Sequence, residues 1–268
     1  MSNTLCILGC GNLGTAILKT LLTTDQLFTH YIACVRSSSS SQRLTTTHPA
    51  LTISTDTVTS IQSAHAVILA LDPSTIASVL AQPGLVDALG TKPLISVAAG
   101  WTRTKLEETL YGSPTDPSTA PKRAGPIEID PAHPPQQSHL ALADAIFARV
   151  GKTIHIPPSL VDATTAVAGS TPAMFAVIVD SMVDAAVAVG VPRALAQSMV
   201  FQAMRGTAGM LQAGEHPALL KDQGTSPEGC TIGGLMVLEE RGGVGRAVRE
   251  AVTLARAMDG EAHVNDTR

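Results

Sequence analysis

The sequence predicts an α/β domain with a doubly wound, mainly parallel sheet, followed by an all-helical domain. Two patterns in the 268-residue chain carry this prediction. In the first half, short apolar runs alternate with helical stretches, which is typical of a parallel sheet covered by helices. After Val161 the apolar residues recur at three- and four-residue intervals, as in helices. We place the two domains at residues 1–157 and 158–268.

Composition limits the class of protein. Hydrophobic residues make up 44% of the chain and aromatic residues only 3%, so the core must consist mainly of aliphatic side chains. A formal net charge of -4 provides no basic field, and we expect no nucleic-acid partner. The four cysteines form no CxxC pair, and the eight histidines show no metal-ligand spacing. We therefore predict no metal site.

The amino terminus and the apolar stretches of the chain indicate where in the cell the protein is located. The amino terminus has no basic region before its apolar run, and glycines interrupt that run, so it does not resemble a secretory signal. We expect no membrane-spanning helix, because no apolar stretch approaches the roughly 20 residues that such a helix needs. We expect a cytoplasmic protein with no membrane partner.

Five strands are expected in the first domain. Four of them contain consecutive apolar residues, as expected for strands buried on both faces. The fifth follows a helix at 140–149 and ends before two prolines. The expected strands are residues 4–8, 30–35, 66–71, 94–98 and 152–156, and the first strand is followed by a helix at 14–22.

Proline interrupts this pattern between Ser113 and Ser138. Seven of the seventeen prolines fall in this segment. Because proline disrupts helices and cannot donate to a sheet ladder, we predict an irregular loop there.

Two long helices are expected in the second domain. Thr171 can cap the first of them, with Pro172 at its first position and Gly190 at its end. The second is expected at residues 192–213, where Gly214 stops it. Both are apolar over most of their faces, so we expect them to pack against another subunit as well as each other.

A glycine motif, GCGNLG at residues 9–14, follows the first strand and opens the first helix. In this context the motif predicts a dinucleotide-binding Rossmann domain. Gly9 permits the tight turn, Gly11 lets a pyrophosphate approach the backbone, and Gly14 allows close packing of helix and strand. Free amides at the helix start would face the phosphates. The alternative is a plain strand–helix turn.

The end of the second strand indicates the cofactor. An NAD site usually has an acidic residue there, whereas this chain has Arg36 and Ser37. Their guanidinium and hydroxyl groups suit the 2′-phosphate of NADPH, so we predict NADPH, with NADH possible but weaker. The alternative is that both residues belong to a solvated loop. The predicted cofactor-binding residues are Leu8, Gly9, Gly11, Asn12, Leu13, Gly14, Arg36, Ser37, Leu71, Pro73 and Ala98.

The most specific motif lies near the carboxyl terminus, GEHPALLKDQGTSPEGCTIGGLMVLEERGG at residues 214–243. It resembles the G-x-HP-x-x-LKD, SPGGTTIxGL and glycine-pair elements of the pyrroline-5-carboxylate reductase family. Residues 168–173, 190–193 and 96–100 resemble the family's SGSGPA, GLPR and SxAAG. The resemblance covers nearly the whole chain apart from the proline-rich segment.

The resemblance implies a homodimer or higher homo-oligomer that reduces 1-pyrroline-5-carboxylate to L-proline by hydride transfer to the imine carbon. It implies that Ser226 and the amides of Gly229 and Cys230 hold the carboxylate of a small cyclic imine. Thr231 would hydrogen-bond the imine nitrogen as the catalytic residue. The residues alone also allow this loop to be a simple helix cap.

Three departures from the family pattern keep other functions open. The MPN-containing strand is missing, Asp72 replaces a lysine, and Glu228 replaces a glycine. They motivate two alternatives: a paralogue that reduces a substituted pyrroline carboxylate in a specialised pathway, and a catalytically impaired NADPH-binding dimer. A hydroxyacid-type dehydrogenase is disfavoured, because residues 172–190 contain no lysine.

Overall fold

A computed structural model describes residues 3–24, 27–49, 51–112 and 137–239. The chain divides into two compact units, Met1–Val161 and Asp162–Arg268. The predicted domain boundary lies after residue 157. Most of the proline-rich segment and the GG pair at 242–243 lie outside the described residues, whereas Gln137 and Ser138 begin a helix.

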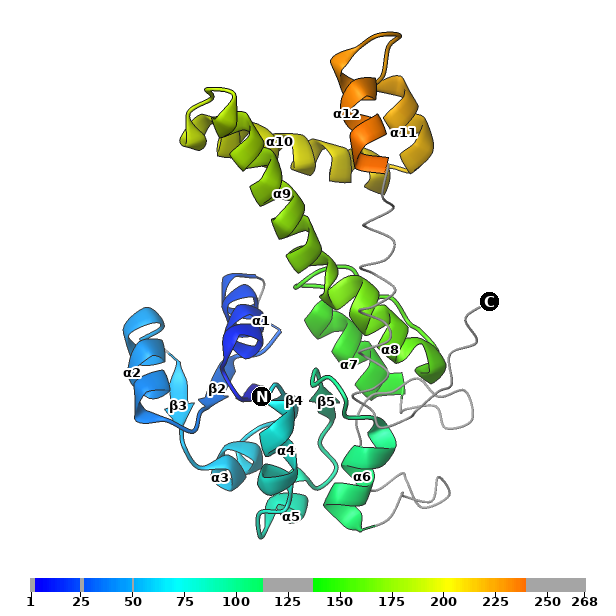
Figure 1. Cartoon of the computed structure of the whole chain (residues 1–268). Helices are drawn as coiled ribbons and strands as arrows, with labels where there is room; N and C mark the ends of the chain where they lie inside the picture. Colours follow the sequence, from blue (N-terminus) through cyan, green and yellow to red (C-terminus); the bar gives the residue numbers. More distant parts are fainter. Residues whose placement is uncertain (1–2, 25–26, 50, 113–136, 240–268) are drawn as a thin grey trace. The chain divides into compact units, whose positions relative to one another are not determined.

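The first unit is built on a parallel five-stranded sheet (Figure 1). Its order is β3-β2-β1-β4-β5, so the connections run outward in both directions from β1. This doubly wound topology confirms the predicted fold class. The strands are β1 (Thr4–Leu8), β2 (His30–Cys34), β3 (Thr52–Ser54), β4 (Ala66–Leu69) and β5 (Leu94–Ser96).

Helices cover both faces of this sheet, and two apolar clusters fill the space beneath them. Cys6 and Leu8 of β1 belong to one cluster, whereas Leu5 and Ile7 belong to the other. This alternation shows that β1 is buried on both faces. The helices are α1 (Asn12–Thr23), α2 (Ser38–Thr47), α3 (Thr57–Gln62), α4 (Pro73–Leu80), α5 (Leu85–Leu89), α6 (Arg103–Tyr111), α7 (Gln137–Phe147) and the 3-10 turn η2 (Pro158–Leu160).

The strand predicted at 152–156 is wrong. These residues have no regular structure, and 73% of Ile154 is exposed. The alternation of apolar and polar residues resembles a strand. However, within the described ranges β5 is the edge of the sheet, with no further strand to pair with. His155 instead places Nε2 2.9 Å from a carboxylate oxygen of Asp144 on α7.

The second unit is helical throughout its described part. After α8 (Val161–Thr164) and a π-helical turn, η3 (Thr165–Gly169), it contains α9 (Thr171–Ala188), α10 (Arg193–Gln212), α11 (Pro217–Gln223) and α12 (Cys230–Glu239). Gly190 and Gly214 have φ values of 98° and 105°, which confirms that glycines in the left-handed region end α9 and α10.

The predicted cap at Thr171 is wrong. The π-helical turn runs directly into α9, and Ser170 has helical angles of φ -87° and ψ -22°. Because the residue before α9 is not extended, no side chain can cap the helix in the usual way. The Thr171 hydroxyl donates back to the Val167 carbonyl instead.

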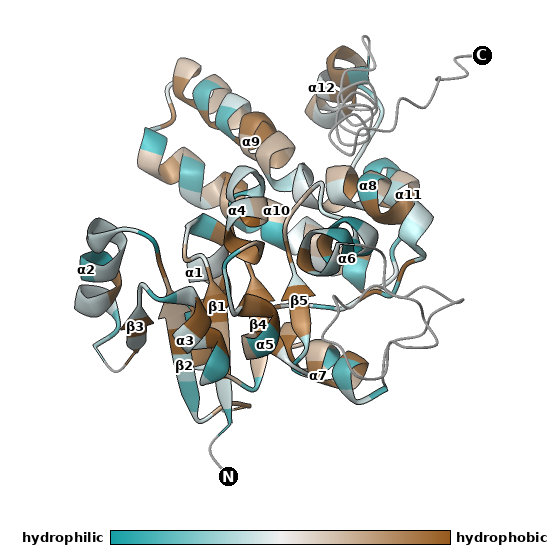
Figure 2. Cartoon of the chain, turned by 90° about the horizontal axis from the view of Figure 1, so that it is seen from below, coloured by the Kyte–Doolittle hydropathy of each residue, from teal (hydrophilic) through white to brown (hydrophobic). Residues whose placement is uncertain are grey.

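The second unit leaves many large apolar side chains exposed, and α9 and α10 show brown, hydrophobic segments in Figure 2. A cavity of about 560 Å³ is lined by side chains of η3, α9 and α10, including Phe175, Phe201 and Met204. The helical run Pro158–Ala188 is long and apolar enough to cross a membrane by length and composition alone. The expectation that no such stretch exists is therefore wrong by this criterion.

Candidate functional site

The glycine loop lies at the point where the strand order reverses. The Gly9 amide donates to the Cys34 carbonyl at 2.9 Å, and the Ala70 amide donates to the Leu8 carbonyl at 2.8 Å. The end of β1 is therefore held between the ends of β2 and β4. In doubly wound sheets, ligands bind in the crevice at this switch point.

Two glycines of the loop are required by close packing. Gly9 has φ 90°, and a Cβ atom there would lie 2.6 Å from the Ala70 carbonyl oxygen. A Cβ atom at Gly14 would lie 2.0 Å from the Gly9 carbonyl oxygen. Any side chain at either position would therefore push β1, β4 and α1 apart.

Gly11 is different, because a Cβ atom there would meet nothing within 4 Å. It is the exposed N-cap residue of α1, and no side chain caps this helix end. The first turn of α1, which contains Asn12 and Leu13, carries no acidic residue. Open space and uncapped amides at a helix start suit a pyrophosphate group.

The end of β2 leads directly into α2. Arg36 is exposed, and the Ser37 hydroxyl caps α2 by accepting from the Ser40 amide at 3.2 Å. The predicted residues Arg36 and Ser37 therefore lie beside the glycine loop, because β2 ends at the Gly9 amide. Sequence patterns alone did not indicate α2, whose residues are mostly serine and threonine.

Asp72 follows β4 and caps α4. Its carboxylate accepts from the Ser74 amide at 2.9 Å, and Pro73 occupies the first turn. The Ser74 hydroxyl and amide lower the pKa of Asp72, with a smaller contribution from the Arg36 guanidinium. The acid that replaces the family's lysine therefore has a local structural role.

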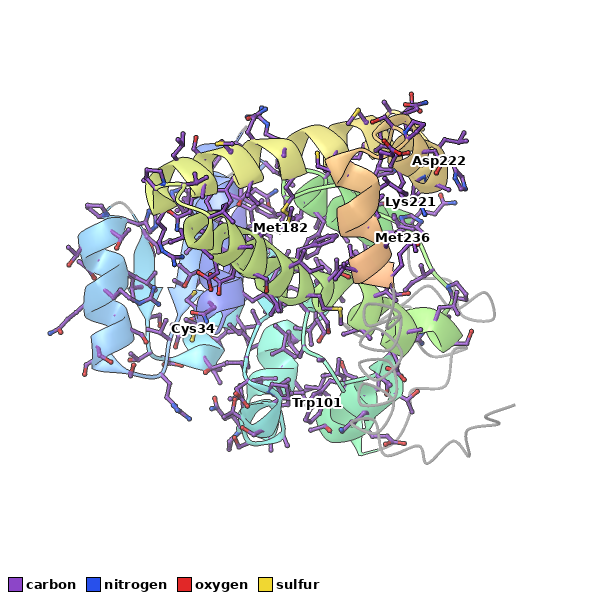
Figure 3. The ribbon with its side chains drawn as sticks, turned by 45° about the horizontal axis from the view of Figure 1, so that its top comes forward. Cys34, Trp101, Met182, Lys221, Asp222 and Met236 are labelled. Atoms are coloured by element: carbon purple, nitrogen blue, oxygen red, sulfur yellow. The ribbon has the colours of Figure 1, made fainter. Side chains whose placement is uncertain are left out.

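Trp101 connects two segments that carry predicted cofactor-binding residues, and sequence patterns did not indicate this residue. Its indole Nε1 donates to the Pro73 carbonyl at 3.0 Å. The Lys105 ammonium lies 4.7 Å from the centre of its ring and donates to the Gly100 carbonyl at 3.0 Å. The start of α4 at Pro73, which follows Leu71, is thus linked to the segment that follows β5 and contains Ala98. Figure 3 labels Trp101.

The predicted substrate residues meet at the start of α12 in the second unit. Among the described residues, the amides of Cys230 and Thr231 and the Thr231 hydroxyl make no hydrogen bond. The Gly229 amide already donates to the Ser226 carbonyl at 3.0 Å. Uncapped amides at a helix start, beside a free hydroxyl, can bind an anion and a hydrogen-bonding ring atom.

The Ser226–Gly229 turn is tight. A Cβ atom on Gly229 would lie 2.5 Å from the Ser226 Oγ atom and 3.0 Å from the Ser226 carbonyl oxygen, so a side chain there would force the Ser226 hydroxyl to move. Glu228 has φ 59°, and among the described residues it is the one non-glycine residue with a positive φ. An L-residue in this region is strained by roughly 1–2 kcal/mol. The substitution of the family's glycine therefore has a conformational cost as well as a charge.

An ion pair joins the helices that flank this turn. Lys221 of α11 donates to a carboxylate oxygen of Glu239 on α12 at 2.9 Å, and this interaction raises the pKa of Lys221. Figure 3 labels Lys221 and Asp222 on α11, and Met236 on α12. In the described part of the chain, no group of three or more His, Cys, Asp or Glu residues could hold a metal ion.

Two protein families match the chain. Residues 158–261 match the family described as pyrroline-5-carboxylate reductase dimerisation. Residues 4–100 match the family described as NADP oxidoreductase, coenzyme F420-dependent.

Curated relatives extend this similarity to nearly the full length. The chain is 39% identical to a pyrroline-5-carboxylate reductase of Lophium arboricola, with 99% of this chain and 96% of the relative covered. It is 35% identical to that of Neurospora crassa, with the same coverage. The Lophium alignment extends over 308 positions, so the relative has residues with no counterpart in this shorter chain.

Solved structures share the fold. A Plasmodium falciparum pyrroline carboxylate reductase with NADP bound superposes with a TM-score of 0.79 at 22% identity, covering 96% of this chain and 98% of the other. A Coxiella burnetii pyrroline-5-carboxylate reductase superposes with a TM-score of 0.76 at 25% identity, with the same coverage.

Proposed function

This chain belongs to the pyrroline-5-carboxylate reductase family, and we propose that it reduces 1-pyrroline-5-carboxylate to L-proline with NADPH. The main observation behind this proposal is that two helices of the chain, α1 and α12, begin with backbone amides that no side chain of the described residues caps. The start of α1 suits a pyrophosphate, and the start of α12 suits a carboxylate.

The first unit holds the cofactor. Gly11 and the amides of Asn12 and Leu13 bind the pyrophosphate, and Arg36 with Ser37 binds the 2′-phosphate. Leu8, Leu71, Pro73 and Ala98 line the adjoining strand ends. When bound, the nicotinamide supplies the hydride for the imine carbon.

The second unit holds the substrate. Ser226 and the Cys230 amide bind the ring carboxylate, while the Gly229 amide keeps the turn closed. The Thr231 hydroxyl hydrogen-bonds the imine nitrogen and orients the ring. A protonated imine is already electrophilic, so the reaction needs no strong general acid. The protein contributes by positioning the substrate and by providing a favourable electrostatic environment.

Glu228 favours a second candidate, a paralogue that reduces a substituted pyrroline carboxylate. Its negative charge lies one residue from the turn glycine of the carboxylate loop. A like charge near the substrate carboxylate disfavours the unsubstituted substrate relative to one with a compensating cationic substituent.

Assembly and location complete the proposal. The dimerisation family match supports a homo-oligomer. The net charge of -4 supports the absence of a nucleic-acid partner, and four free cysteines support a reducing cytoplasmic location. We propose that the apolar helix Pro158–Ala188 contacts a second copy of the chain and no membrane.

The deciding experiment measures NADPH oxidation by the purified protein with 1-pyrroline-5-carboxylate, alongside NADPH binding by calorimetry. Rapid turnover is expected. Tight NADPH binding without turnover would reject the unsubstituted substrate and favour either the paralogue or the impaired dimer. Turnover with a panel of substituted pyrroline carboxylates distinguishes those two.

A further inference from the structure

We infer that Arg43, on the second turn of α2, binds the 2′-phosphate of NADPH together with Arg36. This inference rests on the proposed function, because it assigns a residue to the cofactor that the function requires. It makes Arg43 a residue that determines the preference for NADPH over NADH.

Arg43 reaches the glycine loop from the helix beside it. Its Nη2 atom donates to the Cys10 carbonyl at 2.8 Å and lies 3.4 Å from the Thr15 hydroxyl oxygen. The Thr15 hydroxyl donates to the same carbonyl at 2.8 Å. The guanidinium is therefore held at the first turn of the dinucleotide motif.

This position coincides with the place where the adenosine ribose is expected. In such domains, the residue at the end of the second strand contacts the 2′ position of that ribose. Here the Gly9 amide binds the Cys34 carbonyl at 2.9 Å, so the end of β2 lies against the start of the glycine loop. Arg43 on α2 therefore contacts the glycine loop through the Cys10 carbonyl, and Arg36 follows the strand end that contacts the same loop through Gly9.

Serine hydroxyls gather at the start of α2, the helix that carries Arg43. Ser39 and Ser40 precede Arg43 by four and three residues, so all three side chains share a face of the helix. The Ser37 hydroxyl lies 3.1 Å from that of Ser39 and 3.0 Å from that of Ser40. Hydroxyl and guanidinium groups on one face of a helix are donors of the kind that phosphate oxygens accept from.

The positive charge here lacks a close anionic partner. Within the described ranges, no carboxylate forms an ion pair with Arg36 or Arg43, and the first turn of α2 contains no acid. The Arg36 guanidinium interacts electrostatically with Asp72, but this interaction makes only a minor contribution to the lowered pKa of Asp72. The Nε and Nη1 donors of Arg43 make no hydrogen bond to a described residue, so they remain available for a phosphate.

A purely structural function would give a different result. If Arg43 only braced the Cys10 carbonyl, its loss would disturb the pyrophosphate loop, which NADPH and NADH use equally. If Arg43 binds the 2′-phosphate, its loss affects NADPH alone, because NADH has a hydroxyl at that position. The ratio of the two affinities separates these functions.

The test measures the Kd of NADPH and of NADH by calorimetry for the wild type, Arg43→Met, Arg43→Lys and Lys19→Met. Met keeps the apolar stem of the arginine, and Lys retains its charge without the planar donors. Lys19 is an exposed cation on α1, so its replacement by Met controls for the loss of one positive charge.

We expect Arg43→Met to weaken NADPH binding about 10-fold or more, because hydrogen bonds to charged groups are the strong ones. NADH binding and the Lys19→Met variant should change by less than about twofold, and Arg43→Lys should lie between. Equal losses for both cofactors, or no loss, would overturn the inference while leaving the reductase intact. A wild-type protein that binds neither cofactor would overturn the proposed function itself.

Discussion

The two units of the chain bury their apolar side chains to very different degrees. In the first unit, both faces of the sheet are covered and the β1 and β4 residues are buried. In the described part of the second unit, only Ala166, Val183 and Ala196 are buried hydrophobic residues. The helices α9 to α12 instead expose phenylalanine, methionine, leucine and valine side chains.

This difference shows that the first unit completes its own core and the second does not. Exposed large apolar side chains that gather on one unit mark a surface for contact with another chain. The match to a dimerisation family over residues 158–261 supports a homo-oligomer, and we propose that a second copy of the chain covers this surface. The following predictions test the contrast between a self-contained unit and a shared one.

The largest effect is expected from a charge on the shared surface. Phe201 is 53% exposed and lines the cavity beside α9. Burying one such side chain stabilises an interface by about 1.5–3 kcal/mol, and each copy in a dimer would contribute one. Phe201→Asp should therefore raise the dissociation constant of the oligomer about 100-fold or more. Sedimentation velocity measures this. Val86→Asp, on α5 of the first unit and 38% exposed, is the matched control. Equal assembly in both variants would contradict the contrast.

The Thr231 hydroxyl of the second unit, which we propose to be catalytic, is expected to give the next largest effect. Thr231→Ala should lower kcat about 100-fold, because removing one hydrogen-bond donor to the transition state has an effect of this size in other enzymes. The affinity for NADPH should not change. Steady-state kinetics and calorimetry measure the two quantities. Thr231→Ser keeps the hydroxyl and should retain most of the activity. A loss of NADPH affinity in the alanine variant would show that Thr231 serves the cofactor.

Substitutions at Gly14 and Gly11 test whether the first unit has a tightly packed core of its own. Gly14→Ala should destabilise the first unit by about 2 kcal/mol, because its Cβ would overlap the Gly9 carbonyl. Gly11→Ala meets open space, so it should leave the unfolding temperature unchanged and weaken NADPH binding. Thermal unfolding measures the first effect. Similar melting of the two variants would contradict the packing described for the glycine loop.

A smaller effect is expected from the Trp101 contact, which links the segments that carry the predicted cofactor residues Pro73 and Ala98. Trp101→Phe removes the hydrogen bond to the Pro73 carbonyl and keeps an aromatic ring. The loss of about 1 kcal/mol should weaken NADPH and NADH binding alike, about fivefold. Calorimetric titration checks this, with Tyr111→Phe as a control aromatic change at α6. Unchanged affinities would show that Trp101 does not position these loops.

The smallest effect concerns Glu228. Glu228→Gly relieves the left-handed strain but adds backbone entropy to the unfolded chain, so a gain of about 0.5 kcal/mol in stability is expected. The KM for 1-pyrroline-5-carboxylate should fall because a negative charge is removed near the carboxylate loop. Chemical denaturation and kinetics measure both. Glu228→Gln removes the charge and keeps the strain, so an unchanged KM there would reject the electrostatic reason.

Strands and helix ends could be predicted from the sequence where neighbouring residues form a recognisable pattern. Consecutive apolar residues revealed β1 and β4, and Gly190 and Gly214 marked helix ends, because these signals lie within a few neighbouring residues. The helix α2 and the strand β3 were missed, since polar residues dominate both and neither has an apolar period. The strand at 152–156 was predicted wrongly because pairing depends on a neighbour that a local pattern does not reveal.

Long-range contacts had no sequence signal at all. The Trp101 indole meets a carbonyl 28 residues earlier, and Arg43 meets one 33 residues earlier. Family motifs indicated Ser226, Gly229 and Thr231. They did not indicate that Glu228 adopts a positive φ, because the family pattern has a glycine at this position and the sequence does not encode the backbone angle of its replacement.

Trp101 is the only tryptophan in the chain, so its position gives the protein an intrinsic optical probe. Its emission reports on one junction, where the loop after β4 meets the loop after β5. A reduced nicotinamide absorbs in the range where indole emits, so energy transfer from this single donor would register cofactor arrival without any label. The same signal would record how quickly the cofactor leaves at the end of each turnover.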